Sequence, residues 1–476
     1  MSFPSLTITK DHLRPEGSFA QAQAQFLYPN PEDIAALNAL LQKHRIGIVS
    51  HFYMDAELQG ILSACDYEHI YIADSLLMAD KAVKMAESGV QAIVVLGVDF
   101  MSENVRAVVD AAGYSHIPVY RVDSREIGCS LAESAEAKTY GAWLDQAKES
   151  KNPLHVIYIN TSLQVKAHAH AKIPTITCTS SNVVQTILQA DAQISDLSVW
   201  YGPDTYMGQN LTKMLEQFCT HLSDDEISKI HPHHNRQSIA RLLSNFHVFP
   251  QGNCVVHHMF GADVVQKVRQ DYPNALYTAH LEVPGEMFEL AVEAQNQGRG
   301  VVGSTSNILH FILDQVEGVS EEESNVYIPV VLGTESGMVT SIVRQVQQKL
   351  QDMNRDDIFV QIIFPVASEA VAQDDMFGVL PGIAGGEGCS TAGGCATCPY
   401  MKMNSLEALE NLVEKLGQIL DQGSDVQILQ KFHPKAYSEL LHGRSIAEIG
   451  GEPILFMRHF QSQGKLPQEL IDYVCS

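Results

Sequence analysis

The sequence predicts an α/β fold with several domains and parallel sheets. From residue 46 onward, short β-branched runs alternate with amphipathic helical stretches, a pattern typical of βα units. Roughly nine or ten such units recur along 476 residues, too many for one small sheet. Apolar residues make up 45% of the chain and charged residues 18%, which supplies material for cores and excludes a disordered chain.

The first units lie between residues 46 and 113. IGIVS (46–50) precedes the helical stretch HFYMDAELQ, and HIYIA (69–73) precedes DSLLMADKAVKMAES, where Gly89 suits a helix end. AIVVLGVDF (92–100) then precedes MSENVRAVVDAAG. Three strands, each followed by a helix, predict the first parallel sheet.

The same alternation continues further along the chain. HVIYIN (155–160) precedes TSLQVKAHAHA, and TITC (175–178) precedes TSSNVVQTILQA. The later predicted strands are ALYTAHLE (275–282), GVVGSTS (300–306), IPVVLGTE (328–335) and FVQIIFPV (359–366).

Three segments fall outside this pattern. Residues 1–30 are predicted to be an extension that adds no core. Residues 205–253 are helical and polar and are interpreted as a long inserted connection. After Pro399, the run SLEALENLVEKLGQIL predicts a helix, and a mixed tail follows.

Charge and composition exclude several classes of protein. Lys+Arg 31 against Asp+Glu 56 leaves a net charge of −25, which excludes a general nucleic-acid binder and a basic membrane-surface protein. No apolar run reaches the ~18 residues of a membrane helix, and the first residues contain no apolar signal region. Nine widely spread cysteines argue against a disulfide scaffold and indicate a reducing compartment.

Polar side chains follow most of the predicted strands. In open α/β sheets, ligands bind beyond the carboxyl ends of the strands, so these residues are candidates for a site. Ser, Thr and Asn are also ordinary helix N-caps, which leaves both interpretations open for each of them. The candidates are His51 and Tyr53; Asp74 and Ser75; Tyr158 and Asn160; Thr179 and Ser180; His280 and Glu282; Ser304 and Thr305; and Thr334 and Glu335.

Two of these strand ends indicate specific chemistry. His280 and Glu282 alternate along a strand and therefore point the same way, which suits proton transfer, although a strand-end ion pair is the alternative. GSTS (303–306) opens the helical run NILHFILDQV, and the free N–H groups at a helix start attract anions.

The cysteines are the most specific feature. Cys389, Cys395 and Cys398 form a C-x5-C-x2-C run that ends in Cys-Pro, which favours iron–sulfur ligation, with zinc as the alternative. Cys129 in IGCSLAES and Cys254 in QGNCVVHH lie at strand ends in polar settings. The remaining groups are interpreted as structural: Cys65, Cys178, Cys219 and Cys475 as packing or surface residues, HPHHN (231–235) as a solvated loop, and HAH (168–170) as a helix surface.

Eleven motifs in order resemble the quinolinate synthase family. They are SHFYMDAELQ, ADSLLMAD, LGVDFMSENVR, IGCSLA, YINTSLQVKA, CTSSN, CVVHHMF, AHLEVPGEM, GSTS, GTESG and CATCPYMKMN, and they span residues from about 46 to 404. HFYMDAELQG, VVGSTSNIL and GEGCSTAGGCATCPYMKMNSL resemble the plant-type branch. A fused SufE-like domain and a transit peptide, both expected in plants, are not visible, so a free-standing bacterial version is expected.

The resemblance implies three pseudo-threefold-related three-layer α/β domains with parallel sheets around one central [4Fe–4S] cluster. It implies one cysteine ligand per domain: Cys129, Cys254 and Cys398. Cys389 and Cys395 match a redox-active segment found in part of the family. The domain ranges expected on this basis are 1–30 (N-terminal extension), 31–128 (α/β domain 1), 129–253 (α/β domain 2 with the helical insertion at about 205–253), 254–380 (α/β domain 3), 381–404 (cluster-binding loop) and 405–476 (C-terminal helix and tail).

The family's activity is condensation of iminoaspartate with dihydroxyacetone phosphate to quinolinate, phosphate and water. The implied partners are L-aspartate oxidase and the iron–sulfur assembly machinery, with no nucleic acid and no membrane. The expected compartment is the cytoplasm, or a plastid if the source is photosynthetic and a transit peptide has been removed. The alternatives from other classes are a non-catalytic iron–sulfur or zinc redox sensor or carrier, and an aconitase-like hydro-lyase.

The resemblance also implies roles for individual residues. Glu282 is expected to be the general base, His280 its proton-shuttling neighbour, and Tyr53 and Tyr158 donors that orient the intermediate. An open iron is expected to act as a Lewis acid. The expected substrate-binding residues are His51, Ser75, Tyr158, Asn160, Ser180, His280, Glu282, Ser304 and Thr305.

Overall fold

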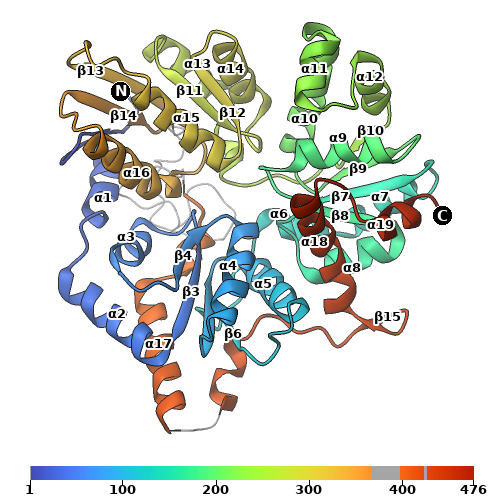
Figure 1. The fold of residues 1–476 in the computed structure, drawn as a ribbon, viewed down its shortest axis with the longest axis horizontal. Coiled ribbons are helices and arrows are strands. Elements are labelled where there is room, and N and C mark those ends of the chain that lie inside the picture. The colour runs from blue at the N-terminus through green and yellow to red at the C-terminus, as the bar shows by residue number, and fades with distance from the viewer. Residues whose placement is uncertain (1, 366–396, 423–425) are drawn as a thin grey trace, which may run out of the picture.

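Three α/β units surround a common centre in the computed structural model, which describes residues 2–365, 397–422 and 426–476 (Figure 1). Each unit holds its own sheet, in which four strands run parallel, with helices packed on the sheet faces. The predicted α/β class with several parallel sheets is therefore confirmed.

The first unit contains the four-stranded sheet β4-β3-β5-β6. Its central strand β5 reads AIVVL and is buried along its whole length, as a strand covered on both faces requires. Helix α17 from the C-terminal part of the chain packs against α2. The bounds are β3 (Ile46–His51), β4 (Ile70–Ala73), β5 (Ala92–Leu96), β6 (Val119–Arg121), α2 (Pro31–His44), α3 (Ala56–Ala64), α4 (Ser75–Glu87), α5 (Asp99–Ala111) and α17 (Leu406–Gln422).

The second unit contains the sheet β10-β9-β7-β8. Strand β10 of this sheet comes from the predicted insertion at residues 205–253. Helix α10 leads from β9 to β10, and β10 pairs parallel with β9, with Phe246 opposite Val199. A three-residue strand is too short to be recognised as an apolar run, so only α11 and α12 are additions to the βα pattern. The bounds are β7 (Pro153–Tyr158), β8 (Thr175–Cys178), β9 (Ser198–Gly202), β10 (Phe246–Val248), α6 (Ser130–Glu136), α7 (Lys138–Ala147), α8 (Leu163–Lys172), α9 (Val183–Gln193), α10 (Thr205–His221), α11 (Asp224–Ile230) and α12 (Arg236–Ser244).

The third unit contains the six-stranded sheet β12-β11-β13-β14-β1-β2. Its parallel part is formed by the four predicted late strands. The bounds are β11 (Leu276–His280), β12 (Gly300–Gly303), β13 (Val326–Gly333), β14 (Ile358–Ile363), α13 (Ala262–Asp271), α14 (Gly285–Gln295), α15 (Thr305–Glu317), α16 (Val339–Asp352), and the 3-10 turns η1 (His257–Met259) and η2 (Ser336–Met338).

The N-terminal residues complete this third sheet, so the expectation that residues 1–30 add no core is wrong. Strand β1 pairs antiparallel with β14, with Leu6 opposite Ile362, and Leu6 and Ile8 are fully buried. The partner strand lies about 350 residues away in the sequence, and such a short run carries no local signal of that pairing. The bounds are β1 (Ser5–Ile8), β2 (Leu13–Glu16) and α1 (Ser18–Phe26).

The C-terminal segment crosses from the first unit to the second. After α17, which packs on the first unit, the chain continues to α18, and Figure 1 shows α18 lying across α8 of the second unit. Among the described residues, no helix is both long and apolar enough to span a bilayer. The bounds are η4 (Met401–Met403), η5 (Val426–Phe432), β15 (Leu440–Leu441), β16 (Arg444–Ser445), α18 (Ile446–Gln463) and α19 (Gln468–Val474).

The buried His155 predicts how stability depends on pH. Its Nδ1 contacts the Trp200 carbonyl oxygen at 2.7 Å and its Nε2 contacts the Tyr140 hydroxyl at 2.9 Å, which satisfies a neutral ring. Burial lowers the pKa of His155 from 6.5 to about 4. The pKa of His155 is lower in the folded than in the unfolded state, so the unfolded state takes up a proton first as pH falls. The contribution of the neutral ring to the free energy of unfolding is therefore complete above pH 6.5. It is lost, by roughly 3 kcal/mol, as pH falls to about 4.

In the His155→Gln variant, the unfolding free energy should therefore fall less steeply between pH 6.5 and 4 than in the wild type. Urea titrations across this range measure the slope. His116→Gln, at an exposed position, is the matched control and should leave the pH dependence of the unfolding free energy unchanged. Equal slopes in the wild type and His155→Gln would contradict the assignment of a buried neutral imidazole.

Candidate active site

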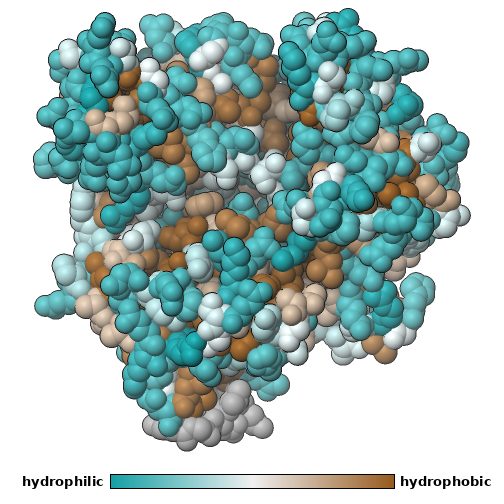
Figure 2. Space-filling model, in the orientation of Figure 1, coloured by the Kyte–Doolittle hydropathy of each residue, from teal (hydrophilic) through white to brown (hydrophobic). Residues whose placement is uncertain are grey.

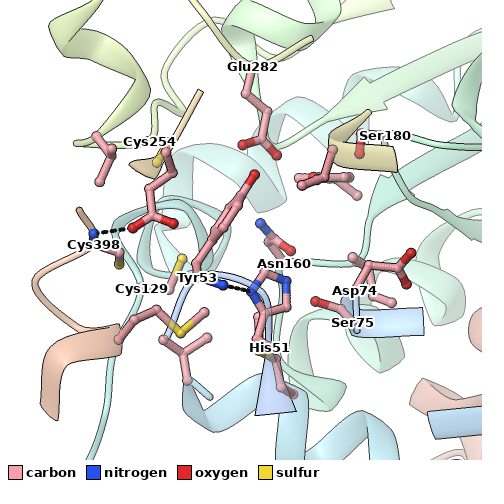
Figure 3. A pocket seen from close by; sticks show the side chains of 18 of the residues that line it. His51, Tyr53, Asp74, Ser75, Cys129, Asn160, Ser180, Cys254, Glu282 and Cys398 are labelled. Carbon is pink, nitrogen blue, oxygen red and sulfur yellow. Dashed lines mark hydrogen bonds between the residues drawn. The ribbon is translucent and has the colours of Figure 1, made fainter. Parts of the chain in front are cut away.

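A pocket lies where the carboxyl ends of the three parallel sheets meet. Figure 2 shows apolar surface gathered in the middle of the visible face, between the three units, with hydrophilic residues on the outer parts. The pocket is lined by all three units and by the segment that carries Cys398 (Figure 3). Its lining residues are His51, Tyr53, Asp74, Ser75, Val98, Phe100, Met101, Cys129, Tyr158, Ile159, Asn160, Thr179, Ser180, Cys254, Val256, His257, His280, Glu282, Thr305, Glu335, Cys398 and Met401.

Most of the residues predicted from strand ends line this one pocket. The exceptions among the predicted residues are Ser304, Thr334, Cys389 and Cys395. The hydroxyl of Ser304 donates to Asn307 Oδ1 at 2.7 Å and accepts the Asn307 N–H, which makes Ser304 the N-cap of α15, while Thr305 lines the pocket. Cys389 and Cys395 lie outside the residues that the structure describes.

Glu282 is a buried carboxylate beside two histidines. Its Oε2 lies 2.8 Å from His257 Nδ1 and 3.7 Å from His280 Nδ1, and the two imidazole rings stack at 5.2 Å. Burial opposes ionisation, but the charges of both histidines and hydrogen bonds from His257 and Tyr158 outweigh it and lower the pKa of Glu282 to about 2. Glu282 is therefore ionised at neutral pH and can accept a proton.

His280, beside Glu282, and His51 are neutral imidazoles at neutral pH. Burial lowers the pKa of His280 and of His51 to about 4. In each ring Nδ1 accepts a backbone N–H, from Glu282 at 3.4 Å and from Tyr53 at 3.1 Å, so Nε2 carries the proton. Both rings can therefore donate a hydrogen bond through Nε2.

The hydroxyl of Tyr53 is a second type of neutral donor. Burial and the charge of Glu282 raise its pKa, and the hydroxyl lies 3.5 Å from Thr334 Oγ1. Burial likewise raises the pKa of Tyr158. Both phenols are protonated throughout the physiological range.

The thiols of three cysteines that lie far apart in the sequence line the same pocket. Cys129 is the N-cap of α6, Cys254 follows β10, and Cys398 lies beside η4. In Figure 3 their side chains lie on one side of the pocket, below Glu282. Burial raises the pKa of all three, that of Cys129 to about 11, while the backbone N–H groups of residues 131 and 132 oppose this rise. Three half-buried cysteines whose thiols line one pocket are a donor set suited to a metal centre.

Glu335 hydrogen-bonds to the backbone of Cys398. Its Oε1 accepts the Cys398 N–H at 2.7 Å, and burial raises its pKa well above the ordinary value. Its Oε2 has no hydrogen-bond partner among the described residues. Glu335 thus links the end of β13 to the segment that carries Cys398.

Helix N-termini are the groups in the pocket wall that can offer positive partial charge to an anion. None of the described lining residues is a lysine or an arginine. Helices α4 and α15 begin at its wall, with Ser75 and Thr305 as their first residues, and α6 begins after Cys129. Helix N-termini carry partial positive charge and free N–H groups, which suits carboxylates or phosphate.

Asp74 and Glu335 were predicted only as strand-end candidates without a specific role, and His257 was not predicted at all. The spacing Cys254-x-x-His257 is the signal that could have identified His257, because a turn of that length returns the imidazole to the thiol. Cys254, His257 and Glu282 each place one ligand atom within 4.8 Å of the others, and they are the metal-capable group found among the described residues. Asp74 caps α4, with its Oδ1 accepting the N–H groups of residues 76 and 77.

The histidine-rich stretches are structural, but their predicted exposure is partly wrong. His231 and His234 are each only 4% exposed, and His234 Nε2 lies 2.8 Å from the Leu188 carbonyl oxygen. His168 is half-exposed, as predicted for a helix surface, whereas His170 is buried beside Glu452. Tertiary contacts cover these rings in a way that local polarity does not indicate.

The sequence of the chain is similar to those of known proteins from one enzyme family. A family model described as "Quinolinate synthetase A protein" matches residues 35–441. The chain is 50% identical to a chloroplastic quinolinate synthase of Nicotiana tabacum, over 99% of this chain and 67% of the relative, and 50% identical to one of Oryza sativa subsp. japonica, over 99% and 69%. A quinolinate synthase of Saccharolobus solfataricus is 27% identical over 79% of this chain and 88% of its own.

The chain spans about two thirds of the length of its plant relatives. The family model covers well over half of the chain and includes residues of all three sheets. From these matches we conclude that the chain belongs to the quinolinate synthase family of enzymes.

Proposed function

We propose that this enzyme condenses iminoaspartate with dihydroxyacetone phosphate to form quinolinate, phosphate and water, a step of NAD biosynthesis. The observation that carries this proposal is the meeting of three thiols, an ionised carboxylate and neutral donors in one pocket without cations. Both substrates are anionic, and the reaction needs proton transfers rather than a redox partner.

The cofactor of this proposal is a [4Fe–4S] cluster held by Cys129, Cys254 and Cys398. The fit rests on three half-buried cysteines that come from separate parts of the fold and whose thiols line one pocket. Bound through three protein thiolates, such a cluster keeps one open iron that supplies a Lewis acid. Zinc is the competing metal, and iron and sulfide analysis of protein purified without oxygen separates the two.

Glu282 is proposed as the general base. Its carboxylate is ionised, buried and flanked by His257 and His280, so a proton taken from a substrate carbon or hydroxyl can be passed to a neighbouring ring. The protonated hydroxyls of Tyr53 and Tyr158 then orient substrate oxygens, since neither phenol ionises in this environment.

Neutral hydrogen bonds are proposed to hold the anionic groups. The residues for this role are His51, Ser75, Asn160, Ser180, Ser304 and Thr305, and all except Ser304 line the pocket. The side chain of Ser304 is occupied by its cap, so its contribution is expected to come through the start of α15 rather than through a direct contact.

Thr305 and Ser304 should therefore respond differently to mutation. Thr305→Val removes a hydroxyl from the pocket wall and is expected to weaken quinolinate binding by about tenfold, the effect of one lost hydrogen bond to a charged group. Ser304→Ala removes the cap and should lower the unfolding free energy by about 1 kcal/mol. Titration calorimetry with quinolinate and thermal unfolding measure the two effects. An unchanged affinity in Thr305→Val would remove its hydroxyl from the binding site.

A coupled assay tests the proposed function. The enzyme, purified without oxygen, is supplied with L-aspartate oxidase, aspartate and dihydroxyacetone phosphate, and quinolinate is measured by mass spectrometry. Quinolinate formation that depends on all components is the expected result. Hydration or dehydration of a hydroxy acid without quinolinate would favour the aconitase-like alternative instead.

The proposed partners are L-aspartate oxidase as the source of iminoaspartate and the iron–sulfur assembly machinery as the source of the cluster. The proposed compartment is reducing, either the cytoplasm or a plastid; the plant relatives are named chloroplastic. Cys389 and Cys395 are proposed as a redox pair, because neighbouring thiols can oxidise to a disulfide.

A further inference from the structure

The turn that carries Asn160 is held from behind by a buried lysine. This turn, Ile159–Leu163, joins β7 to α8, and Figure 3 shows the Asn160 side chain in the pocket. Lys166 is fully buried, and its Nζ donates to the carbonyl oxygens of Ile159, at 3.1 Å, and of Thr161. The two residues that flank Asn160 are thus tied to one ammonium group that does not itself line the pocket.

A buried carboxylate from another unit holds the end of the same turn. Glu103 on α5 is only 2% exposed, and its Oε2 accepts the Leu163 N–H at 2.8 Å, at the start of α8. Burial raises the pKa of Glu103 and lowers that of Lys166, in each case to about 7, and the opposite charge of the other group opposes the shift. The Asn160 turn is therefore fixed to the first unit as well as to its own.

The C-terminal segment completes this support at Tyr437. The hydroxyl of Tyr437 donates to both oxygens of Glu103, each at 3.1 Å. Burial and the charge of Glu103 raise the pKa of Tyr437, so this hydroxyl remains a donor. A carboxyl group that accepts hydrogen bonds from two sides, from the Leu163 N–H and from the Tyr437 hydroxyl, is held in one orientation.

Helix α18 touches the same turn directly. A Cβ atom at Gly450 would lie 2.2 Å from the Leu163 carbonyl oxygen, so only glycine allows α18 to pack this closely. A Cβ atom at the next residue, Gly451, would meet only Ala107 at an ordinary 3.7 Å. Figure 1 shows α18 across α8, and α18 begins after the last residue that the family model matches, 441.

We propose that Tyr437, through Glu103, and α18, through its direct contact with Leu163, are positioning elements that act together with Lys166 to hold Asn160 in its binding orientation. The C-terminal segment is then a functional part of the active site rather than a packing addition to the second unit. The inference rests on the proposed function only in assigning Asn160 to substrate binding; the mechanical support of the turn stands on the contacts above.

Hydrogen exchange tests the mechanical part without turnover. Two variants weaken the support, Tyr437→Phe and Gly450→Ala, and two matched controls lie in the same segment. Gly451→Ala adds the same methyl group where there is room, and Tyr473→Phe removes a hydroxyl that donates to the His170 carbonyl oxygen at 3.0 Å. Amide exchange in residues 159–163 should become about tenfold faster in the two test variants and stay within about twofold of wild type in the controls.

Kinetics test the functional part. Tyr437→Phe should lower kcat/KM for quinolinate formation by about five- to tenfold, mainly through KM, with the visible absorbance of the cluster and the melting temperature close to those of Tyr473→Phe. If Tyr437 acts through Asn160, its effect should shrink to less than about twofold in an Asn160→Ala background, because mutations that act through one contact are not additive.

Several outcomes overturn the proposal. Wild-type exchange rates in residues 159–163 in both test variants would remove the mechanical support. Faster exchange with unchanged kcat/KM, or losses that multiply fully in the Asn160→Ala background, would show that the segment does not act through Asn160. A wild-type enzyme that forms no quinolinate refutes the proposed function, while the exchange comparison still decides whether the C-terminal segment holds the turn.

Discussion

Glu282→Gln is expected to lower quinolinate formation by about 10²- to 10⁴-fold, the usual contribution of a general acid–base residue. Glutamine keeps the shape of the side chain and can still accept from Tyr158, but it cannot take up a proton. The wild-type carboxylate is ionised because His257 Nδ1 lies 2.8 Å from its Oε2 and Tyr158 hydrogen-bonds to it. The substitution therefore removes the charge and leaves the packing of the pocket.

The measurement is kcat in the coupled assay, with cluster absorbance and thermal unfolding as checks on the protein. Glu286→Gln is the matched control, since Glu286 is exposed and lies outside the pocket in the first turn of α14. The control should keep wild-type kcat. A Glu282→Gln enzyme with more than about a tenth of wild-type turnover would remove Glu282 from the role of base.

Serine at Cys129, Cys254 or Cys398 is expected to abolish both the visible absorbance of thiolate-bound iron and the activity. All three thiols line one pocket, and no further cysteine is among its described lining residues, so a lost thiolate has no replacement there. The three residues come from distant parts of the chain, and each substitution should therefore have the same effect despite the separation in sequence. Visible spectra and iron content of protein purified without oxygen measure the loss.

The other cysteines are the controls for this prediction. Cys475→Ser at an exposed position and Cys178→Ser in β8 should keep the absorbance, as should Cys389→Ser and Cys395→Ser. Changes at Cys389 or Cys395 are expected to alter only the response to oxidants. If Cys389→Ser lost the cluster and Cys254→Ser kept it, the ligand set would be wrong, together with the roles assigned around it.

The fold was predictable where its signal is local. Runs such as AIVVL are apolar, β-branched and followed by a helix, and β5 lies where that pattern puts it. Strand β10 was not recognised because it has only three residues, and β1 was not recognised because it lies outside the βα alternation and is identified as a strand only through its pairing with β14. Such pairings depend on partners that the local sequence does not indicate.

The site was predictable through one geometric rule. Because ligands bind beyond the carboxyl ends of parallel strands, the positions after β3, β7 and β11 indicated His51, Asn160 and Glu282, and all three line the pocket. The rule could not separate Ser304 from Thr305, since both follow β12. Only the side-chain contacts show that Ser304 caps α15 while Thr305 faces the cavity.

By itself, the sequence determined the α/β class, most of the parallel strands, the residues at their ends and the resemblance to one enzyme family. These properties depend on neighbours within a few residues, or on motifs that persist in order along the chain. The tertiary structure decided that β1 joins β14, that His257 lies against Glu282, and that Tyr437 and Gly450 support the Asn160 turn. Those contacts join segments tens to hundreds of residues apart, and their energy depends on distances that exist only once the three sheets have folded around a common centre.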